Sequence, residues 1–391
     1  MNVAFVTAAE IPSRWANSIQ VVKMAQGFRE LGHDVDLITA GSYKQWKTDD
    51  SGPIWEHYGV STPFTLSHLP LRPLLKLEKK LDCGRLSYGY LVSRWKQRRN
   101  VDLVFARNYI APYWSAKLGI PTIAESHADV DNFYQKHRLF EAARLPSFRA
   151  LVTISDRLAA DYAEAGVPTN KIIVEQDGVD LSLFKHTDPS QVQGLRKSLL
   201  RHKRAIVLYA GHLYDYKGIP TILNTAEILT DVSFILVGGW EHDIERVQQQ
   251  VTARKLGNVH LQGFVPNRNI PAYLKAADIL LLPNSAEHAQ SHTTSPLKLF
   301  EYMASGTPIV ASEIQNVKHV LRQRENAVLF QPDNAHSLAE GIETSLKTPE
   351  DAARWASHAE TDAHQYSWSE RVRRIIEFAR LDQDPIHSQQ V

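Results

Sequence analysis

Short apolar runs and longer segments of helical periodicity alternate along almost the whole chain. The first run, Val3 to Val6, is followed by residues 19–31, whose apolar positions recur at helical spacing up to Gly32. A second strand is expected from His33 to Ile38. Two strands joined by a helix and short loops form a βαβ unit with parallel strands and a right-handed crossover. The pattern therefore favours an α/β protein.

The alternation continues in two blocks separated by a polar linker, roughly residues 185–190. In the first block we expect helices over residues 113–118 and 157–165, and strands at residues 102–105, 121–124, 151–154 and 171–174. In the second block we expect strands at 204–209, 233–237, 259–261, 279–282 and 307–311, and helices over 219–229, 243–255, 270–277 and 297–305. Two tandem, doubly wound α/β domains of Rossmann type are the simplest interpretation.

Length and composition limit the class of protein. The 391 residues suit two domains, and the hydrophobic content of 43% argues against a disordered chain. The formal net charge of +1 excludes a basic nucleic-acid wrapper, and the sequence contains no known nucleic-acid recognition module. The single cysteine, Cys83, excludes an internal disulfide and a thiolate metal cage.

The sequence also predicts a location in the cell. No apolar run approaches the ~20 residues that a membrane-spanning helix needs. The first strand begins directly after Met1 and Asn2, without a secretory signal. A lone cysteine favours a reducing compartment. We therefore expect a cytoplasmic protein.

Ligands of doubly wound sheets bind beyond the carboxyl ends of the strands, and we expect a cleft between the two domains to hold a small molecule. One strand-end segment is residues 211–218. Gly211 allows a close approach of backbone to ligand, and Lys217 supplies a point charge for a phosphate. The segment lacks the second half of a Walker loop. The alternative is an ordinary strand-to-helix turn with a surface lysine.

A second segment leads into the helix expected from residue 297. Ser295 suits the N-cap and Pro296 the first helical position. The N–H groups of Leu297 and Lys298 then stay available for an anion such as a diphosphate. Glu301, further along this helix, is placed to accept hydrogen bonds from sugar hydroxyls. The alternative is a capped core helix with Glu301 in solvent.

His127 follows the strand at residues 121–124 in the first block. A histidine at the carboxyl end of a strand is a candidate proton carrier or hydrogen-bond donor. The alternative is a purely structural histidine.

Taken in order, these motifs resemble the GT-B glycosyltransferases, specifically glycosyltransferase family 4, over nearly the whole chain. In the first half the resemblance is carried by residues 2–6, 31–35, 152–155, 166–168 and 177–181. In the second half it is carried by residues 211–218, 263–266, 277–278, 295–304 and 306–310.

The resemblance implies an acceptor-binding domain over residues 1–184, a nucleotide-sugar-binding domain over residues 185–365, and a final helix within residues 366–382 that crosses back to the first domain. It also implies a retaining transferase of hexosyltransferase type, which moves a sugar from a nucleotide diphosphate sugar to an acceptor hydroxyl. No cofactor or metal is implied, because positive groups and a helix N-terminus stabilise the leaving diphosphate. The sequence itself contains no strong acidic metal cluster.

By the same resemblance, Lys217 neutralises the diphosphate, Glu301 holds the ribose hydroxyls, and His127 lies beside the transferred sugar. These three are the predicted catalytic residues. The predicted donor-binding residues are Gly211, His212, Thr293, Ser295, Pro296, Leu297 and Glu301.

Three positions depart from the family pattern. His212 stands where many members carry an arginine, and Thr293 stands eight positions before Glu301, where the family has a second glutamate. The first loop lacks the usual paired glycines, and we expect Asn17 and Ser18 to cap the first helix and present amides to acceptor or phosphate. Two alternatives to the transferase stay open: a non-catalytic nucleotide-sugar-binding module, and a sugar-nucleotide epimerase or hydrolase.

Residues 72–99 carry nine basic and two acidic side chains, a net charge of +7, interleaved with leucines and aromatic residues. Such a mixture suits the surface of an anionic membrane, where basic residues lie among the headgroups. The membrane patch would comprise Lys76, Lys79, Lys80, Arg98 and Arg99. It suits a lipid-linked or envelope acceptor at the inner face of a membrane. The alternative is a pair of surface helices that pack their leucines inward.

Overall fold

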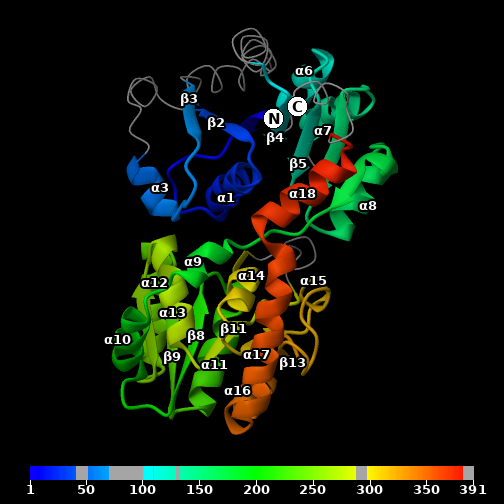
Figure 1. Ribbon diagram of the computed structural model, residues 1–391. Coiled ribbons are helices and arrows are strands. Elements are labelled where there is room, and N and C mark those ends of the chain that lie inside the picture. Colours follow the sequence, from blue (N-terminus) through cyan, green and yellow to red (C-terminus); the bar gives the residue numbers. More distant parts are fainter. Residues whose placement is uncertain (41–51, 70–99, 109, 129–132, 288–296, 382–391) are drawn as a thin grey trace. The chain divides into compact units, whose positions relative to one another are not determined.

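A computed structural model of the chain describes residues 1–40, 52–69, 100–108, 110–128, 133–287 and 297–381 (Figure 1). These residues form two compact units. Unit 1 comprises the chain up to Gly178 together with the part that begins at Ser367, and unit 2 spans Val179–Tyr366.

Unit 1 is built on a seven-stranded parallel sheet with the order β3-β2-β1-β4-β5-β6-β7. Its central strands are apolar and buried on both faces, as in sheets covered by helices on either side. The strand order reverses beside β1, which pairs with β2 on one side and β4 on the other. The strands are β1 (Asn2–Thr7), β2 (Asp34–Ala40), β3 (Thr65–Leu69), β4 (Leu103–Arg107), β5 (Thr122–Ser126), β6 (Phe148–Thr153) and β7 (Ile172–Val174).

The helices of unit 1 include one from the far end of the chain. Helix α18 (Trp368–Phe378) packs on α1 (Ala16–Glu30), where a Cβ at Gly27 would lie 2.8 Å from the carbonyl carbon of Trp368. Glycine at this position therefore permits the close crossing of the two helices. The other helices are α3 (Gly52–Tyr58), α6 (Ala111–Lys117), α7 (Phe133–Ala143) and α8 (Asp156–Glu164).

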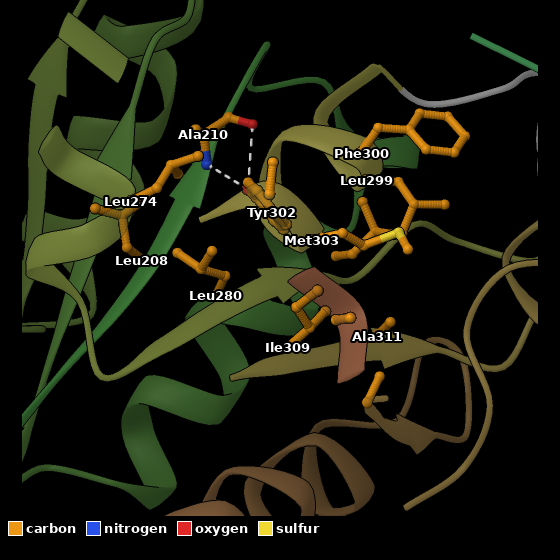
Figure 2. Close-up of a cluster of buried hydrophobic side chains, with 14 of the residues drawn as sticks. Leu208, Ala210, Leu274, Leu280, Leu299, Phe300, Tyr302, Met303, Ile309 and Ala311 are labelled. Atoms are coloured by element: carbon orange, nitrogen blue, oxygen red, sulfur yellow. Dashed lines mark hydrogen bonds between the residues drawn. The ribbon is translucent and has the colours of Figure 1, made fainter. Parts of the chain in front are cut away.

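Unit 2 contains a six-stranded parallel sheet with the order β10-β9-β8-β11-β12-β13, and its order reverses between β8 and β11. One buried apolar cluster, partly drawn in Figure 2, contains Leu208 of β8, Leu280 of β11 and Met303 of α14. A second cluster contains Val207 and Leu281, the sequence neighbours of the two leucines, so alternate residues of one strand enter different clusters. The strands are β8 (Ala205–Ala210), β9 (Val232–Val237), β10 (Val259–Gly263), β11 (Ile279–Leu282), β12 (Ile309–Ser312) and β13 (Val328–Phe330).

The helices of unit 2 surround this sheet. They are α9 (Leu181–Lys185), α10 (Pro189–Leu200), α11 (Ile219–Ile228), α12 (Glu241–Ala253), α13 (Ile270–Ala276), α14 (Leu297–Ala304), α15 (Gln315–Lys318), α16 (Ala335–Lys347) and α17 (Pro349–Ala363). Short 3-10 turns span Thr169–Lys171 in unit 1 and Asp215–Lys217, Asn267–Asn269 and His364–Tyr366 in unit 2.

The predicted fold class, two doubly wound parallel α/β domains, is confirmed by the two sheets. The segment expected as a polar linker is partly helical, because α10 begins inside it. Asp188 caps this helix by accepting a hydrogen bond from the Ser190 N–H, and Pro189 lies in the first turn. The compact units divide at Val179 rather than at residue 185, because Val179 is buried in the core of unit 2 and donates its N–H to Tyr366. The cleft expected between the domains stays a prediction.

Among the residues that the structure describes, no helix is long and apolar enough to cross a membrane. The predicted membrane patch of Lys76, Lys79, Lys80, Arg98 and Arg99 lies outside the described residues. So do Thr293, Ser295 and Pro296 of the predicted donor site.

Candidate functional site

Two groups of polar side chains lie at the carboxyl ends of parallel strands, one in each unit. In unit 2 we define the basic cluster as His212, Lys217 and Lys298. The first two belong to the loop after β8, and Lys298 is the second residue of α14. Strand β8 borders the reversal of strand order, where doubly wound sheets bind their ligands.

Glycines shape the loop after β8. Gly211 has a φ of 145°, donates its N–H to the carbonyl of Val237, and would bring a Cβ to 2.8 Å from the Lys298 ammonium nitrogen. Gly218, directly after Lys217, has a φ of 83°, and its Cβ would lie 1.7 Å from the carbonyl oxygen of Pro283. A larger residue at either position would displace a neighbour of the basic cluster.

The sequence analysis predicted a role for the backbone N–H of Lys298 but not for its side chain, which belongs to the basic cluster. Its ammonium nitrogen is buried and has no hydrogen-bond partner among the described residues. It lies 3.8 Å from the centre of the Tyr209 ring. Burial, and then the charge of Lys217, hold the pKa of Lys298 well below its usual range, against the opposing effect of Glu301.

The pKa values of the other two members, Lys217 and His212, are also lowered. Burial lowers the pKa of Lys217. Burial, followed by the charges of Lys298 and Lys217, lowers the pKa of His212, while Asp243 opposes the shift. The charge of Lys217 thus disfavours the charged forms of Lys298 and His212, and the charge of Lys298 disfavours that of His212. An anion placed among these groups would reverse the effect.

Helix α14 is fixed against β8 by a buried tyrosine. The Tyr302 hydroxyl accepts a hydrogen bond from the Ala210 N–H at 2.8 Å and donates to the Ala210 carbonyl at 3.4 Å (Figure 2). Glu301, one residue earlier, accepts a hydrogen bond from the Asn267 side-chain amide at 3.3 Å. The start of α14, its Glu301 carboxylate and the loop after β8 are therefore held in one place.

Aromatic rings extend from the basic cluster in a stack. His212 lies parallel to Tyr214 with ring centres 5.2 Å apart, and to Trp240 at 5.7 Å. Tyr214 in turn stacks on Tyr216 at 5.4 Å. His212, where we noted a departure from the family arginine, thus stacks on two aromatic rings.

In unit 1 we define the buried ring as Gln20, Arg107, Glu125 and His127, which are joined in a closed circuit. Arg107 donates to Gln20 Oε1, the side-chain amide oxygen, at 2.6 Å, and the Gln20 side-chain NH2 donates to Glu125 Oε1 at 2.8 Å. Glu125 Oε1 lies 2.6 Å from His127 Nε2, and His127 Nδ1 lies 3.0 Å from Arg107 Nη2.

The strand carrying Glu125 is longer than predicted. Strand β5 continues through Ser126, because Glu125 and Ser126 pair with Val152 and Thr153 of β6. Glu125 is therefore a fully buried strand residue, and His127, two positions later, keeps 14% of its side chain exposed. Continuing the strand's alternation by one residue would put His127 on the same face as Glu125, which is the signal that could have linked them.

Both ring nitrogens of His127 are engaged within unit 1. Burial and the charge of Arg107 lower the pKa of His127, although Asp177 and Glu125 oppose the shift. A proton carrier needs a ring nitrogen that can reach the substrate, and in this arrangement both nitrogens of His127 already face Arg107 and Glu125.

Glu125, His127 and Asp177 place one potential metal-ligand atom each within 4.8 Å of one another. The sequence did not indicate this group. Glu125 Oε1 already accepts from Gln20, His127 and Arg371, and the charges of Arg107 and Arg371 both act on Asp177, whose pKa is nevertheless raised by burial. Two guanidinium groups therefore supply the positive charge that these carboxylates need.

Asn17 and Ser18 lie inside α1, not before it as a cap. The helix begins at Ala16, and its N-cap position is Trp15, which makes no side-chain capping bond. Ser18 is buried, and its hydroxyl donates to the carbonyl of Trp15 or Ser13. The Asn17 carbonyl accepts a hydrogen bond from Arg107 at 2.9 Å, which places this helix start beside the buried ring.

Unit 1 also has a cavity of about 800 Å³ at the opposite ends of its strands. Its lining includes Asn2, Asp34 and Thr65, the first residues of β1, β2 and β3. It does not include any residue of the buried ring.

Two family patterns match the chain. That of the glycosyl transferases group 1 matches residues 193–362, and that of glycosyltransferase family 4 matches residues 18–183. Among curated relatives, a D-inositol 3-phosphate glycosyltransferase of Catenulispora acidiphila is 24% identical, over 92% of this chain and 89% of its own. A putative colanic acid biosynthesis glycosyl transferase of Escherichia coli is 25% identical, over 84% and 88%.

The fold is shared with solved structures at lower identity. The Anabaena protein HepE, solved in complex with UDP-glucose, matches with a TM-score of 0.72 and 19% identity, over 98% of this chain and 99% of its own. Sucrose-phosphate synthase of Thermosynechococcus elongatus matches with a TM-score of 0.74 and 17% identity, over 97% and 98%.

Proposed function

Because the chain belongs to the glycosyltransferases of group 1 and family 4, we propose that it moves a sugar from a nucleotide diphosphate sugar to an acceptor hydroxyl, with retention of anomeric configuration and without a metal ion. The enzyme is a glycosyltransferase. The basic cluster is the observation that supports a nucleotide diphosphate sugar as its donor. A diphosphate is the group that three converging basic side chains would bind, and the HepE complex with UDP-glucose makes that donor the first to test.

Lys217, Lys298 and His212 would surround the diphosphate. Each charge-assisted hydrogen bond contributes about 1.5–3 kcal/mol. The first turn of α14 adds N–H groups that have no acceptor within the helix, and the positive end of the helix dipole. Gly211 leaves the backbone open next to Lys298, so a phosphate oxygen can approach both.

Glu301 would bind the ribose hydroxyls of the donor. A carboxylate offers about four acceptor positions on its two oxygens, and the Asn267 amide donates to Oε1, which orients the group and leaves other positions for hydroxyls. We propose that Glu301 acts in binding and that Lys217 and Lys298 act at the reacting phosphate.

In the transfer step, the bond between the sugar's anomeric carbon and the β-phosphate oxygen breaks, and its electron pair stays on the diphosphate. The acceptor oxygen bonds to the anomeric carbon on the same face, which retains the configuration. The basic cluster lowers the barrier by stabilising charge that grows on the leaving oxygen. We assign the acceptor's proton to the departing diphosphate, because both nitrogens of His127 are engaged.

Metal independence is supported by the charge distribution in both units. The basic cluster can neutralise the diphosphate, which is the usual task of a magnesium ion in such reactions. In unit 1, a cation near Glu125 and Asp177 would face the guanidinium groups of Arg107 and Arg371. We therefore propose that no metal takes part.

For the acceptor, we propose a lipid-linked or envelope glycoconjugate in contact with an anionic membrane surface. The +7 charge of residues 72–99 supports this choice, since basic side chains gather at anionic headgroups. One of the relatives carries a name from colanic acid biosynthesis.

A panel of labelled nucleotide sugars tests the proposal. A thermal shift first identifies the donors that bind, and release of nucleotide is then measured with and without candidate acceptors. Release that requires an acceptor supports transfer, whereas release without one indicates a hydrolase. Tight binding of a donor with no turnover for any acceptor would contradict the enzymatic proposal, provided that EDTA treatment and added Mg²⁺ give the same result.

A further inference from the structure

Arg371 comes from α18, 246 positions after Glu125, yet both side chains are completely buried against each other. Arg371 Nη2 donates to Glu125 Oε1 at 2.9 Å and to the Glu175 carbonyl at 3.0 Å. Its Nε donates to the Gln176 carbonyl at 2.7 Å, and its Nη1 lies 3.1 Å from the Met24 sulfur. The guanidinium is thus fixed on all sides within unit 1.

The charge of Arg371 determines the state of Glu125. Burial alone would raise the pKa of Glu125, but the Arg371 charge, the hydrogen bond with His127 and the Arg107 charge together bring it well below its usual range. Glu125 is therefore ionised, and an ionised carboxylate can only accept hydrogen bonds. Its Oε1 accepts three, from Gln20, His127 and Arg371.

The ionised state of Glu125 determines which nitrogen of His127 carries the hydrogen. Since Glu125 cannot donate, His127 Nε2 must carry a hydrogen and donate it at 2.6 Å. Arg107 has only donors to offer, so His127 Nδ1 must accept at 3.0 Å. Both neighbours demand the same neutral tautomer, with the hydrogen on Nε2.

We propose that Arg371 is a positioning residue that fixes the tautomer and the ring orientation of His127 through Glu125. The terminal helix α18 is then a functional part of the buried ring and not only a cover for α1. The tautomer stands independently of the proposed function, whereas its effect on turnover rests on that function, with His127 near the transferred sugar.

The position of Arg371 on α18 also supports a role beyond packing. Its apolar positions Trp368, Val372, Ile375 and Ile376 form one buried face, and Arg371 lies on that face. A buried arginine among apolar residues is costly unless it meets an acid, and Glu125 is that acid. An uncharged side chain would suffice if the face served packing alone.

The test is nitrogen NMR of the full-length protein labelled at histidine, which reports the protonation of each imidazole nitrogen. His127 should appear as the neutral form with hydrogen on Nε2, assigned by its loss in His127→Asn. In Arg371→Met the uncompensated Glu125 takes up a proton, so its carboxyl and Arg107 both present donors to an imidazole that can accept only one of them. The single tautomer should therefore give way to a mixture of the two neutral forms. In the transferase assay, we expect kcat to fall about tenfold or more with little change in KM for the donor.

Two further variants keep the test decisive. Arg374→Met is the matched control, since Arg374 is a neighbour on α18 whose guanidinium pairs with the Glu175 carboxylate at 2.8 Å. The His127 signals of this variant should match those of the wild type. If Arg371→Met does not fold, Arg371→Met with Glu125→Gln removes both charges and should recover folding. It should not restore a single His127 tautomer, because the introduced amide can donate to the imidazole as well as accept from it.

The proposal is wrong if His127 of the wild type carries its hydrogen on Nδ1. It is also wrong if Arg371→Met, or the double variant, keeps the wild-type His127 signals and loses only thermal stability. A wild type that shows the expected tautomer but transfers no sugar would contradict the proposed function and leave this inference intact.

Discussion

The Lys298 ammonium lies over the ring of Tyr209, 3.8 Å from its centre, and no described residue offers it a hydrogen bond. A cation over an aromatic face gains about 2 kcal/mol when it is desolvated. Burying an ammonium without a counter-ion costs several kcal/mol. The position is therefore unfavourable for a charged lysine until an anion arrives, and this imbalance favours binding of a diphosphate.

Lys298→Met should weaken donor binding, because the methionine keeps the volume over Tyr209 and removes the charge. We expect a loss of about 1.5–3 kcal/mol, equivalent to roughly 10- to 150-fold in Kd, as for a charge-assisted hydrogen bond. Titration calorimetry with UDP-glucose, or with whichever donor the panel identifies, gives the measurement. Lys197→Met on the exposed face of α10 is the control. Unchanged affinity in Lys298→Met would remove Lys298 from the site.

Donor binding should take up protons. The lowered pKa of Lys298, and to a lesser degree that of Lys217, raises the neutral fraction of these lysines before binding, and the diphosphate favours their charged forms. Affinity should therefore fall as pH rises through these lowered pKa values. At about pH 8, above the ordinary histidine pKa of ~6.5, calorimetry in two buffers of different ionisation enthalpy should show this uptake. It should be smaller in Lys298→Met; an uptake equal to that of the wild type would contradict the assignment.

Glu301→Gln should impair donor binding without unfolding unit 2. The amide can accept fewer hydrogen bonds from ribose hydroxyls and brings its own donors, so we expect Kd to rise about tenfold. The melting temperature should match that of Glu340→Gln, an exposed acid on α16. A large loss of thermal stability with normal donor affinity would instead mean that Glu301 serves the structure of α14.

The membrane patch predicts binding to anionic vesicles. Flotation with vesicles that contain an anionic lipid should carry the protein upward, and replacing Lys76, Lys79 and Lys80 with glutamate should abolish it, because each basic residue near the surface contributes about 1 kcal/mol. Reversal of Lys197, Lys255 and Lys347, three exposed lysines of unit 2, is the matched control. Equal flotation of both triple variants would contradict a specific patch.

The sequence predicted the strand ends well, because short apolar runs between glycines mark buried parallel strands. It therefore located Gly211, Lys217 and His127 at the correct edges of the two sheets. It placed Glu125 in a loop, since a charged residue seldom belongs to a buried strand. Only the pairing with β6 shows that the strand continues through it.

The remaining site residues depend on contacts between distant segments. Arg371 meets Glu125 across 246 positions, and the side chain of Lys298 reaches Tyr209 of a strand almost ninety positions earlier. Local periodicity identifies a helix but not the acid or the ring that its buried lysine or arginine will contact. The tertiary structure supplies that information.

The central claim is sugar transfer with retention, and proton NMR of the reacting mixture tests it most directly. With a donor and an acceptor from the panel, the first product formed should have the same anomeric configuration as the donor, and Lys217→Ala should slow its appearance. A first product of inverted configuration would contradict retention. Free sugar released at the same rate without acceptor would contradict transfer itself.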